Sequence, residues 1–305
     1  MTHMAANLSA PAVVSPPPAE LRDPALAKIR DLIYRNSGIY QSEPKFYLLA
    51  NRCQRRMKAV GSGSYQEYFE RLTLDSDRDG EMRRLLNEIT IGETCMFRNQ
   101  PQVDALTKVI LPKLATLKSK QFQKKIRFWS AGCSTGEEPY TLSIVMLQEI
   151  ATRLKGWTFE IVATDLNDQS LAKCKEGLYT DYALRNTALP LREKYFQKEG
   201  ELYRVSEEVR GPIKFDRLNL SDQTRMLFQK GLDVIFCCNV LIYFDGASKR
   251  QTVGHFYNSL IPGGYFFLGH SESLFGIYDQ FRLVHFPNAT AYYKPLGNET
   301  AGAPQ

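Results

Sequence analysis

Apolar side chains recur at helical spacing over the first third of the chain, across residues 21–90. Leu26, Ile29 and Ile33 are separated by three and four residues, which places them on one face of a helix. A Gly-Ser repeat then breaks the pattern, and its last residue, Ser64, is a suitable N-cap for another helix. No alternation typical of a strand is evident in this part. The pattern therefore predicts a small helical domain over residues 21–90.

Beyond about residue 105 the pattern changes to short apolar runs separated by longer amphipathic stretches. Such alternation indicates βαβ units and a mostly parallel sheet. The run 232–238 is almost continuously apolar, as expected of a strand buried on both faces. The predicted strands are 125–130, 159–165, 232–238 and 265–268, the predicted helices are 138–154, 171–175 and 247–260, a turn is predicted at Pro262–Gly264 and a final hairpin within 281–294.

Residues 176–212 interrupt this rhythm. The segment 201–205 alternates like a strand and the preceding residues can form a turn, so a small antiparallel insertion is expected here. The predicted fold class is α/β: a small N-terminal helical domain followed by a Rossmann-like domain with this insertion. The expected divisions are a disordered lead-in over 1–20, the helical domain, a linker over 91–110, an α/β domain over 111–295 and a flexible tail over 296–305.

Composition limits the possible classes of protein. The 305 residues are 43% apolar and 24% charged, as in ordinary globular proteins, and no run approaches the roughly 18 apolar residues of a membrane span. The first 20 residues lack the basic and apolar segments of a signal peptide. The six cysteines and four histidines show no metal-ligand or disulfide spacing, which favours reduced thiols, a cytoplasmic location and no metal. The net charge of +6 does not by itself imply a nucleic-acid partner.

A candidate ligand-binding loop follows the first predicted strand. In an open α/β sheet, ligands bind at the carboxyl ends of the strands, and Gly132 and Gly136 would allow a ligand close to the backbone. A pyrophosphate would need a helix start free of anions, yet Glu137 and Glu138 stand there, and both common phosphate-binding glycine motifs are absent. Two carboxylates suit a positively charged ligand without phosphate, such as S-adenosylmethionine. Alternatively, they only stabilise the helix dipole.

Two further polar residues end strands beside the same expected cleft. Asp165 can accept both hydroxyls of a ribose, although an isolated Asp here could also merely cap a helix. Asn239 ends the run 232–238. Many DNA and RNA amino-methyltransferases carry Pro-Pro and an aromatic residue after this position, whereas this chain continues Val-Leu-Ile-Tyr. A nucleic-acid base is therefore a disfavoured substrate.

A basic cluster lies within the helical domain. Arg52, Arg55 and Arg56 are spaced as on one face of a helix, and Lys58 follows. Such clusters are ordinarily solvated surface, and this alternative stays open on the residues alone.

Five segments, in order along about residues 25–295, resemble the CheR family of chemotaxis-receptor glutamate methyltransferases. The Ser-Thr-Gly-Glu-Glu-Pro-Tyr and Asn-Val-x-Ile-Tyr-Phe motifs are specific when they occur together. The segments are Gly92–Arg98, Ser130–Tyr140, Ala163–Asp165, Leu218–Leu220 and Phe236–Phe244, with Gly269–Ser273 downstream.

This resemblance implies a class I methyltransferase fold and a role for each matching residue. Arg98 and Tyr243 would flank the methyl-accepting carboxylate and orient it. Two positions depart from the family, which often has Asn in place of Gly92 and Arg in place of Cys238. The residues that would line the S-adenosylmethionine site are Gly92, Thr94, Arg98, Gly132, Glu138, Asp165, Asn219, Leu220, Cys238 and Asn239.

The resemblance also implies a partner. The basic helix with Arg52, Arg55, Arg56 and Lys58 would meet the acidic cytoplasmic helical bundle of a chemoreceptor. The predicted hairpin is short, which favours an enzyme that needs no receptor tail peptide as a tether. The alternatives are a methyltransferase with another substrate, a non-catalytic S-adenosylmethionine-binding signalling protein and, more distantly, a dehydrogenase. Neither nucleic-acid binding nor membrane insertion is expected.

Overall fold

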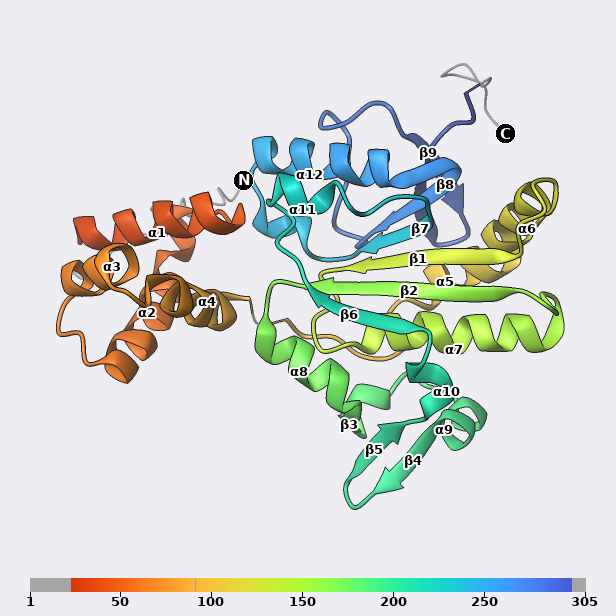
Figure 1. Cartoon of the computed structure of the whole chain (residues 1–305), viewed down its shortest axis with the longest axis horizontal. Helices are drawn as coiled ribbons and strands as arrows, with labels where there is room; N and C mark the ends of the chain where they lie inside the picture. The colour runs from red at the N-terminus through yellow and green to blue at the C-terminus, as the bar shows by residue number, and fades with distance from the viewer. Residues whose placement is uncertain (1–22, 91, 298–305) are drawn as a thin grey trace, which may run out of the picture.

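The computed structural model describes residues 23–90 and 92–297. It consists of a helical domain and an α/β domain from which a small antiparallel sheet projects (Figure 1). The lead-in expected over 1–20 lies outside the described residues, and so does the tail expected over 296–305 except for its first two residues.

The N-terminal part of the described chain is helical, as the spacing of its apolar residues predicts. Asp23 caps the first helix by accepting from the Ala25 N–H at 2.8 Å, and Gly38 ends this helix with a φ of 70°. The side chain of Ser64 caps the third helix, as predicted. The helices are α1 (Pro24–Ser37), α2 (Phe46–Val60), α3 (Tyr65–Leu74) and α4 (Arg78–Ile89), with a 3-10 turn at Glu43–Lys45.

A sheet of seven strands forms the centre of the α/β domain, in the order β6-β2-β1-β7-β8-β10-β9. The first five strands of this order are parallel, and the last two form an antiparallel hairpin. The mostly parallel sheet and the final hairpin are thus confirmed. The strands are β1 (Lys125–Ala131), β2 (Thr158–Asp165), β6 (Ile213–Arg217), β7 (Leu232–Cys237), β8 (Leu260–Leu268), β9 (Arg282–Phe286) and β10 (Ala289–Tyr293).

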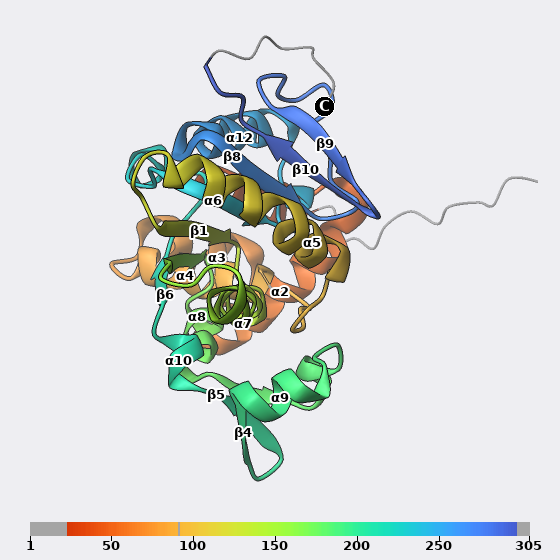
Figure 2. The same cartoon turned by 90° about the vertical axis from the view of Figure 1, so that its right-hand side faces the viewer.

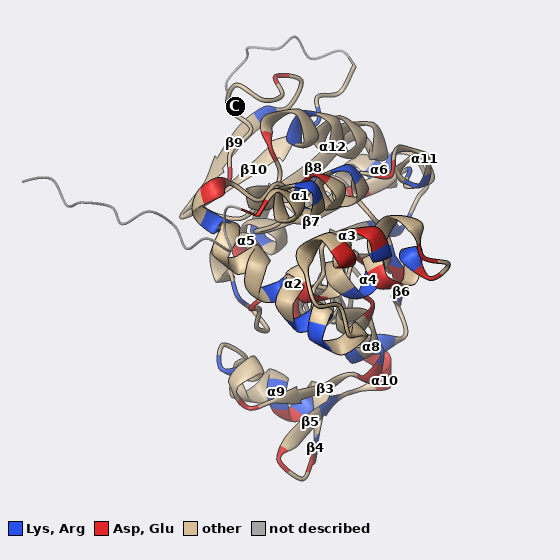
Figure 3. Ribbon diagram, turned by 90° about the vertical axis from the view of Figure 1, so that its left-hand side faces the viewer, with Lys and Arg blue, Asp and Glu red and all other residues tan. Residues whose placement is uncertain are grey.

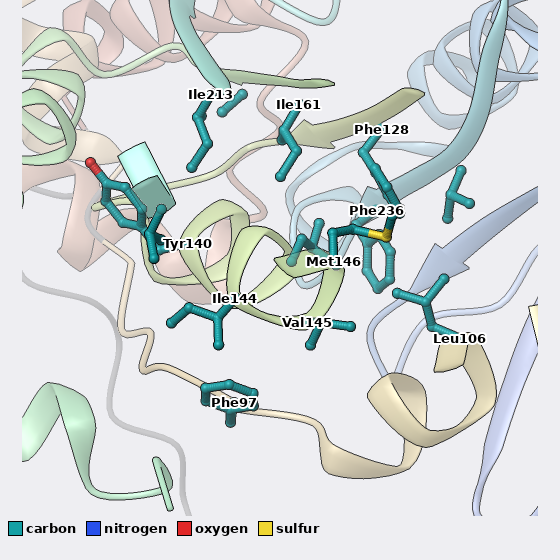
Figure 4. Close-up of a cluster of buried hydrophobic side chains, with 14 of the residues drawn as sticks. Phe97, Leu106, Phe128, Tyr140, Ile144, Val145, Met146, Ile161, Ile213 and Phe236 are labelled. Carbon is teal, nitrogen blue, oxygen red and sulfur yellow. The ribbon is translucent and has the colours of Figure 1, made fainter. Parts of the chain in front are cut away.

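One face of the sheet packs on helices α5 to α7 (Figure 2). Phe128, Ile161 and Phe236 extend from three neighbouring strands towards Met146 of α7 (Figure 4), and Ile144 of the same helix belongs to the same buried cluster. All five side chains are buried, so this layer fixes the direction in which α7 leaves the sheet. The helices of the α/β domain are α5 (Gln100–Ala105), a π-helical turn (Leu106–Ile110), α6 (Leu111–Ser119), α7 (Glu137–Thr152), α8 (Asp168–Glu176), α11 (Gln223–Met226) and α12 (Gly246–Ser259).

The opposite face of the sheet packs on α12, and the same cluster of buried residues continues into the helical domain. Trp129 of β1 meets Phe256 of α12 with ring centroids 5.0 Å apart, and Leu26 and Ile33 of α1 belong to this cluster. All four side chains are fully buried. The helical domain therefore shares a hydrophobic core with the sheet.

The antiparallel insertion is confirmed as a separate three-stranded sheet in the order β3-β5-β4. Only Gly200 and Glu201 connect β4 to β5, so this hairpin is tight. The elements of the insertion are β3 (Leu178–Thr180), a 3-10 turn (Tyr182–Leu184), α9 (Leu189–Tyr195), β4 (Phe196–Glu199), β5 (Leu202–Val205) and α10 (Glu207–Arg210).

The turn predicted at Pro262–Gly264 is wrong, because these residues lie within strand β8. The pairing of β8 with β7 shifts register here, and Gly263 adopts a φ of 87°. Lys294 supplies partners on the other side: its carbonyl accepts from Gly263 and its N–H donates to Gly264. A β-bulge thus accommodates residues that normally end a strand.

A buried ion pair lies at the start of β7. The ammonium of Lys118 is 2.8 Å from both carboxylate oxygens of Asp233, and the backbone N–H of Arg127 donates to the same carboxylate at 2.7 Å. The side chain of Asp233 is fully buried and that of Lys118 is 5% exposed. This pair joins the end of α6 to the sheet at the edge opposite the carboxyl ends of the strands.

Candidate functional site

A cavity of about 490 Å³ lies at the carboxyl ends of β1, β2 and β7. Its volume falls within the roughly 300–1,000 Å³ of small-molecule sites. The ends of α1 and α4, the linker after the helical domain and residues within 218–220, 240–244 and 269–270 form the rest of the wall. The predicted site residues that line it are Gly92, Thr94, Arg98, Gly132, Glu138, Asp165, Asn219, Leu220, Cys238, Asn239 and Tyr243.

The loop between β1 and α7 begins with a glycine that no other residue could replace without rearrangement. Gly132 has a φ of 76°, and an added Cβ would lie 2.4 Å from Cγ2 of Val240. The N–H groups of Gly132 and Cys133 both donate to the carbonyl of Thr164. The loop is therefore anchored to the end of β2, directly beside Asp165.

Glu138 presents a carboxylate to the cavity from the first turn of α7. The hydroxyl of Ser130 donates to it at 2.6 Å. Burial raises the pKa of Glu138 to about 7, while the hydrogen bond from Ser130 and the positive charge of Arg98 act in the opposite direction. The site can therefore change its charge near neutral pH.

Glu137 differs from its expected placement beside the ligand. Its side chain is buried and accepts from the hydroxyl of Thr135 at 2.7 Å, and it is absent from the cavity lining. Burial raises the pKa of Glu137 as well. The helix start thus offers one carboxylate to a ligand, that of Glu138, instead of the two expected from the sequence.

Asp165 is held by backbone groups at the end of β2. Its two oxygens accept from the N–H groups of Ser134 and Asn167, each at 2.8 Å. Burial raises the pKa of Asp165, and these hydrogen bonds oppose the rise. Because a carboxylate has about four lone-pair sites, two remain for hydroxyl groups of a ligand.

Asn239 begins a tight turn after β7 and has a φ of 61°, which is unusual for a residue other than glycine. Its backbone N–H donates to the carboxylate of Glu272 at 2.6 Å. Glu272 also accepts from Gly269 at 2.8 Å and from Ile242 at 3.1 Å. Glu272 lies in the segment Gly269–Ser273 that resembles the family, but the sequence analysis assigned it no role. A carboxylate that accepts from backbone groups cannot be identified from the residues next to it in the sequence.

The linker after the helical domain is fixed to two other parts of the chain. Phe97 donates from its N–H to the hydroxyl of Thr141 at 3.0 Å, and Met96 donates to the carbonyl of Ala183 at 2.9 Å. Arg98 then extends along the cavity, with one guanidinium nitrogen 2.9 Å from the carbonyl oxygen of Glu93. The remaining donors of this exposed guanidinium are available to a carboxylate.

Gln102 is a cavity residue that the sequence reasoning missed. Its side chain is buried and donates to the carbonyl of Leu268 at 2.6 Å. Its carbonyl oxygen lies 3.7 Å from the sulfur of Cys238. A glutamine within the expected linker gives no sequence signal of this kind.

The helical domain closes one side of the cavity. Ile39 pairs with Phe244 in an isolated antiparallel bridge, and the N–H of Tyr40 donates to the carbonyl of Tyr243 at 2.8 Å. Tyr243 lines the cavity with 40% of its side chain exposed. The sequence did not predict this closure, because it depends on contacts between residues about 200 positions apart. The lining residues from this side are Ser37, Ile39, Ile89 and Thr90.

The basic cluster on α2 is only partly a free surface. Arg56 forms a bidentate pair with Glu81, at 3.0 and 2.8 Å, and its side chain is only 17% exposed. The side chain of Arg55 is 61% exposed, with Glu88 at 3.6 Å. Lys58 is exposed and Arg52 is half-buried. Arg56 therefore does not share an exposed face with the others, although basic positions are visible along α2 (Figure 3).

Comparisons with known proteins agree with this arrangement. The family model described as CheR methyltransferase, SAM binding domain matches residues 92–290, and the model described as CheR methyltransferase, all-alpha domain matches residues 24–90. The chain belongs to the CheR methyltransferase family. Its cofactor is therefore S-adenosylmethionine, as predicted from the glycine loop, Glu137, Glu138 and Asp165 together with the resemblance.

Several curated relatives are similar to this protein over most of its length. Chemotaxis protein methyltransferase 2 of Vibrio cholerae is 32% identical over 90% of this chain and 94% of its own length. A chemotaxis protein methyltransferase of Borreliella burgdorferi is 32% identical over 82% of this chain and 88% of its own length. That of Escherichia coli is 30% identical over 86% and 89%.

The chemistry of the cavity fits the cofactor of a CheR methyltransferase. S-adenosylmethionine carries a positive charge and a ribose, and the wall offers the carboxylates of Glu138 and Asp165 to these groups. Among residues 23–90 and 92–297, no group of three or more His, Cys, Asp or Glu side chains could hold a metal ion. Within the same ranges, no helix has both the length and the apolar character that crossing a bilayer requires.

Proposed function

We propose that this chain transfers the methyl group of S-adenosylmethionine to glutamate side chains in the cytoplasmic helical bundle of chemoreceptors, giving methyl esters and S-adenosylhomocysteine. The relatives named above are chemotaxis protein methyltransferases. One observation carries the proposal: Glu138 and Asp165 share a single cavity with Arg98 and Tyr243, a cation and a phenol suited to a carboxylate acceptor.

The proposed cofactor contacts come from the polar residues along the wall. Asp165 would accept from the ribose hydroxyls, and Glu138 would attract a positive charge of the cofactor. When bound, S-adenosylmethionine supplies a methyl group activated by its sulfonium sulfur. The residues that complete the proposed cofactor wall are Gly92, Thr94, Arg98, Gly132, Asn219, Leu220, Cys238 and Asn239.

The acceptor needs orientation more than activation. A glutamate side chain has a reference pKa of about 4.3, so it is ionised at pH 7 and requires no general base. Arg98 would hold one carboxylate oxygen while the hydroxyl of Tyr243 steadies the group, leaving the other oxygen aligned with the methyl. These two residues are the proposed catalytic residues.

Methyl transfer from tritiated S-adenosylmethionine to receptor cytoplasmic domains tests this assignment. Arg98→Ala is expected to lower kcat at least tenfold, and Tyr243→Phe several-fold. Arg250→Ala is a matched control, because Arg250 is also exposed and donates to a single backbone carbonyl. Full activity of Arg98→Ala would contradict the assignment. Binding of S-adenosylhomocysteine without any turnover would indicate a non-catalytic protein, and preferential methylation of RNA another substrate.

We also propose that residues 21–90 recognise the receptor, 91–110 link this domain to the active site and 111–295 carry out methyl transfer. Recognition would use Arg52, Arg55 and Lys58 on α2, with Arg56 contributing mainly through its pair with Glu81. Electrostatic docking should be sensitive to salt.

Charge reversal tests this surface. Arg55→Glu is expected to lower kcat/KM for the receptor several-fold at low salt, with unchanged affinity for S-adenosylhomocysteine. Arg83→Glu, at an exposed position of α4, is the control of equal charge. Equal losses in the two variants would show that only net charge matters, and α2 would then have no special role.

We further propose that the enzyme acts in the cytoplasm and without a receptor tail peptide as tether. All six cysteines are free, which suits a reducing compartment. The hairpin β4–β5 turns through only two residues, Gly200 and Glu201, which leaves a short loop for a peptide to engage. Calorimetric titration with receptor tail peptides should show no binding, and micromolar affinity would overturn tether independence.

A further inference from the structure

Glu272 is placed to control the turn that joins the two halves of the site. One of its oxygens, Oε2, accepts from the N–H groups of Asn239 and Gly269, at 2.6 and 2.8 Å. The other, Oε1, accepts from the N–H of Ile242 at 3.1 Å. A single carboxylate thus binds three backbone groups from two segments that are about 30 residues apart in the chain.

The backbone geometry around this carboxylate leaves little freedom. Asn239 holds a φ of 61°, in the left-handed region that asparagine enters more readily than most residues other than glycine. A Cβ on Gly269 would lie 2.8 Å from Oε2 of Glu272 and 2.9 Å from the backbone nitrogen of Asn239. The segment around Gly269 is therefore in close contact with the turn, and the carboxylate of Glu272 accepts hydrogen bonds from the N–H groups that converge there.

The turn 239–243 contains one residue assigned to the cofactor and one assigned to the methyl acceptor. Asn239 belongs to the cofactor wall, and Tyr243 ends the 3-10 turn Leu241–Tyr243 at the cavity. On its other side, the carbonyl of Tyr243 accepts from the N–H of Tyr40. Glu272 and Tyr40 hold the turn from opposite sides, so the distance between the cofactor and the Tyr243 hydroxyl depends on both.

We propose that Glu272 is a positioning residue for methyl transfer, which acts by fixing residues 239–243 so that Tyr243 is aligned with the cofactor. This inference rests on the proposed function, because it assigns Tyr243 to the acceptor. Glu272 itself is absent from the cavity lining, so it acts through the turn and not by contact with a ligand.

Replacement by glutamine separates this role from simple packing. The glutamine side chain in Glu272→Gln would have nearly the same shape, but its amide can offer only one oxygen. If that oxygen stays on Asn239 and Gly269, the NH2 group faces the N–H of Ile242, and two donors oppose each other. Glu272→Gln therefore releases the part of the turn next to Tyr243 while keeping the part that lines the cofactor.

The test compares Glu272→Gln with Glu208→Gln, the same change at an exposed carboxylate of α10. Glu272→Gln should lower kcat at least tenfold with the affinity for S-adenosylhomocysteine within threefold of wild type. In the double variant with Tyr243→Phe, the loss should be smaller than the product of the two single losses. Glu208→Gln should match the wild type.

An unchanged kcat would overturn the inference, and so would losses of Glu272→Gln and Tyr243→Phe that simply multiply. A charge effect of Glu272 on the cofactor would instead weaken binding of S-adenosylmethionine more than that of S-adenosylhomocysteine, and this outcome also contradicts positioning.

Amide hydrogen exchange provides a readout that does not depend on the acceptor. In Glu272→Gln the N–H of Ile242 should exchange faster, while amides elsewhere in the sheet keep their protection. Failure of the wild type to methylate receptors would refute the proposed function alone. Unchanged exchange at Ile242 would refute the role of Glu272 even if receptors are methylated.

Discussion

The side-chain amide of Asn219 donates a hydrogen bond of 2.6 Å to the main-chain carbonyl of Asn36. Asn219 lines the cavity, whereas Asn36 belongs to the last turn of α1. The side-chain oxygen of Asn219 also accepts from the N–H of Ser221 at 3.0 Å, and the hydroxyl of Ser221 donates to the main-chain carbonyl of Ser37. The helical domain therefore helps to set the shape of the cavity wall.

Replacing Asn219 by Asp should weaken this connection without changing the size of the side chain. The carboxylate can still accept from Ser221, but its second oxygen would face the carbonyl oxygen of Asn36. Loss of a partly exposed hydrogen bond costs about 1 kcal/mol, so the Kd for S-adenosylhomocysteine should rise about fivefold. Calorimetry measures this change, with Asn258→Asp on exposed surface as control. Equal affinities of the two variants would show that the contact with Asn36 is unimportant.

Cofactor affinity should fall as the pH is lowered through neutrality. Burial raises the pKa of Glu138 to about 7. A positively charged ligand favours the ionised carboxylate, so below pH 7 binding must first remove a proton from Glu138. The Kd for S-adenosylhomocysteine, whose ammonium stays charged, should rise between pH 7.5 and 5.5, by at most about tenfold per pH unit. Glu138→Gln should bind more weakly at pH 7.5 and show a shallower slope, and an unchanged slope would assign the effect to another group.

Substitution of two glycines with similar φ angles distinguishes backbone strain from steric crowding by an added Cβ. Gly132 and Gly156 have φ angles of 76° and 78°, but an added Cβ meets Val240 at 2.4 Å in the first and open space in the second. Gly156→Ala should lose about 1 kcal/mol of stability from backbone strain alone. Gly132→Ala should in addition lose most of its affinity for S-adenosylhomocysteine. Thermal unfolding and calorimetry on both variants check this, and equal affinities would show that the loop adjusts freely.

The ion pair between Lys118 and Asp233 should be costly to break from one side. Lys118→Met leaves a buried carboxylate without its cation, and the free energy of unfolding should fall by about 3–5 kcal/mol. Lys118→Met combined with Asp233→Asn removes both charges and should recover much of this loss. Urea unfolding measures both, with Lys113→Met on the exposed surface of α6 expected within about 0.5 kcal/mol of wild type. No recovery in the double variant would contradict this account.

Much of the fold follows from local patterns in the sequence. The apolar spacing of α1, the cap at Ser64 and the continuous apolar run of β7 each report burial of a single element. The mostly parallel sheet follows from the alternation of predicted strands with predicted helices along the chain. The strand β8 was misjudged at Pro262 because the carbonyl and N–H of Lys294, distant in sequence, stabilise a bulge where local rules favour a turn.

The candidate site was predictable wherever strand ends determine position. Asp165 and Asn239 lie at the same edge because parallel strands end there, and the cavity brings them together. The partial burial of Arg56 was not predictable, because it depends on the ion pair with Glu81. The burial of Glu137 was not predictable either, because it depends on the hydrogen bond from Thr135. The position of Glu272 was not predictable either, since its carboxylate accepts hydrogen bonds from backbone groups of distant segments.

The shared hydrophobic core has a consequence for the modularity of this family. Trp129 and Phe256 of the α/β domain belong to the same buried cluster as Leu26 and Ile33 of α1. A chain that began at residue 92 would lack Leu26 and Ile33 and would expose to water the part of this cluster that the helical domain covers. Exchange of the helical domain for that of a relative must therefore preserve a packing surface as well as the charges that we propose for receptor recognition.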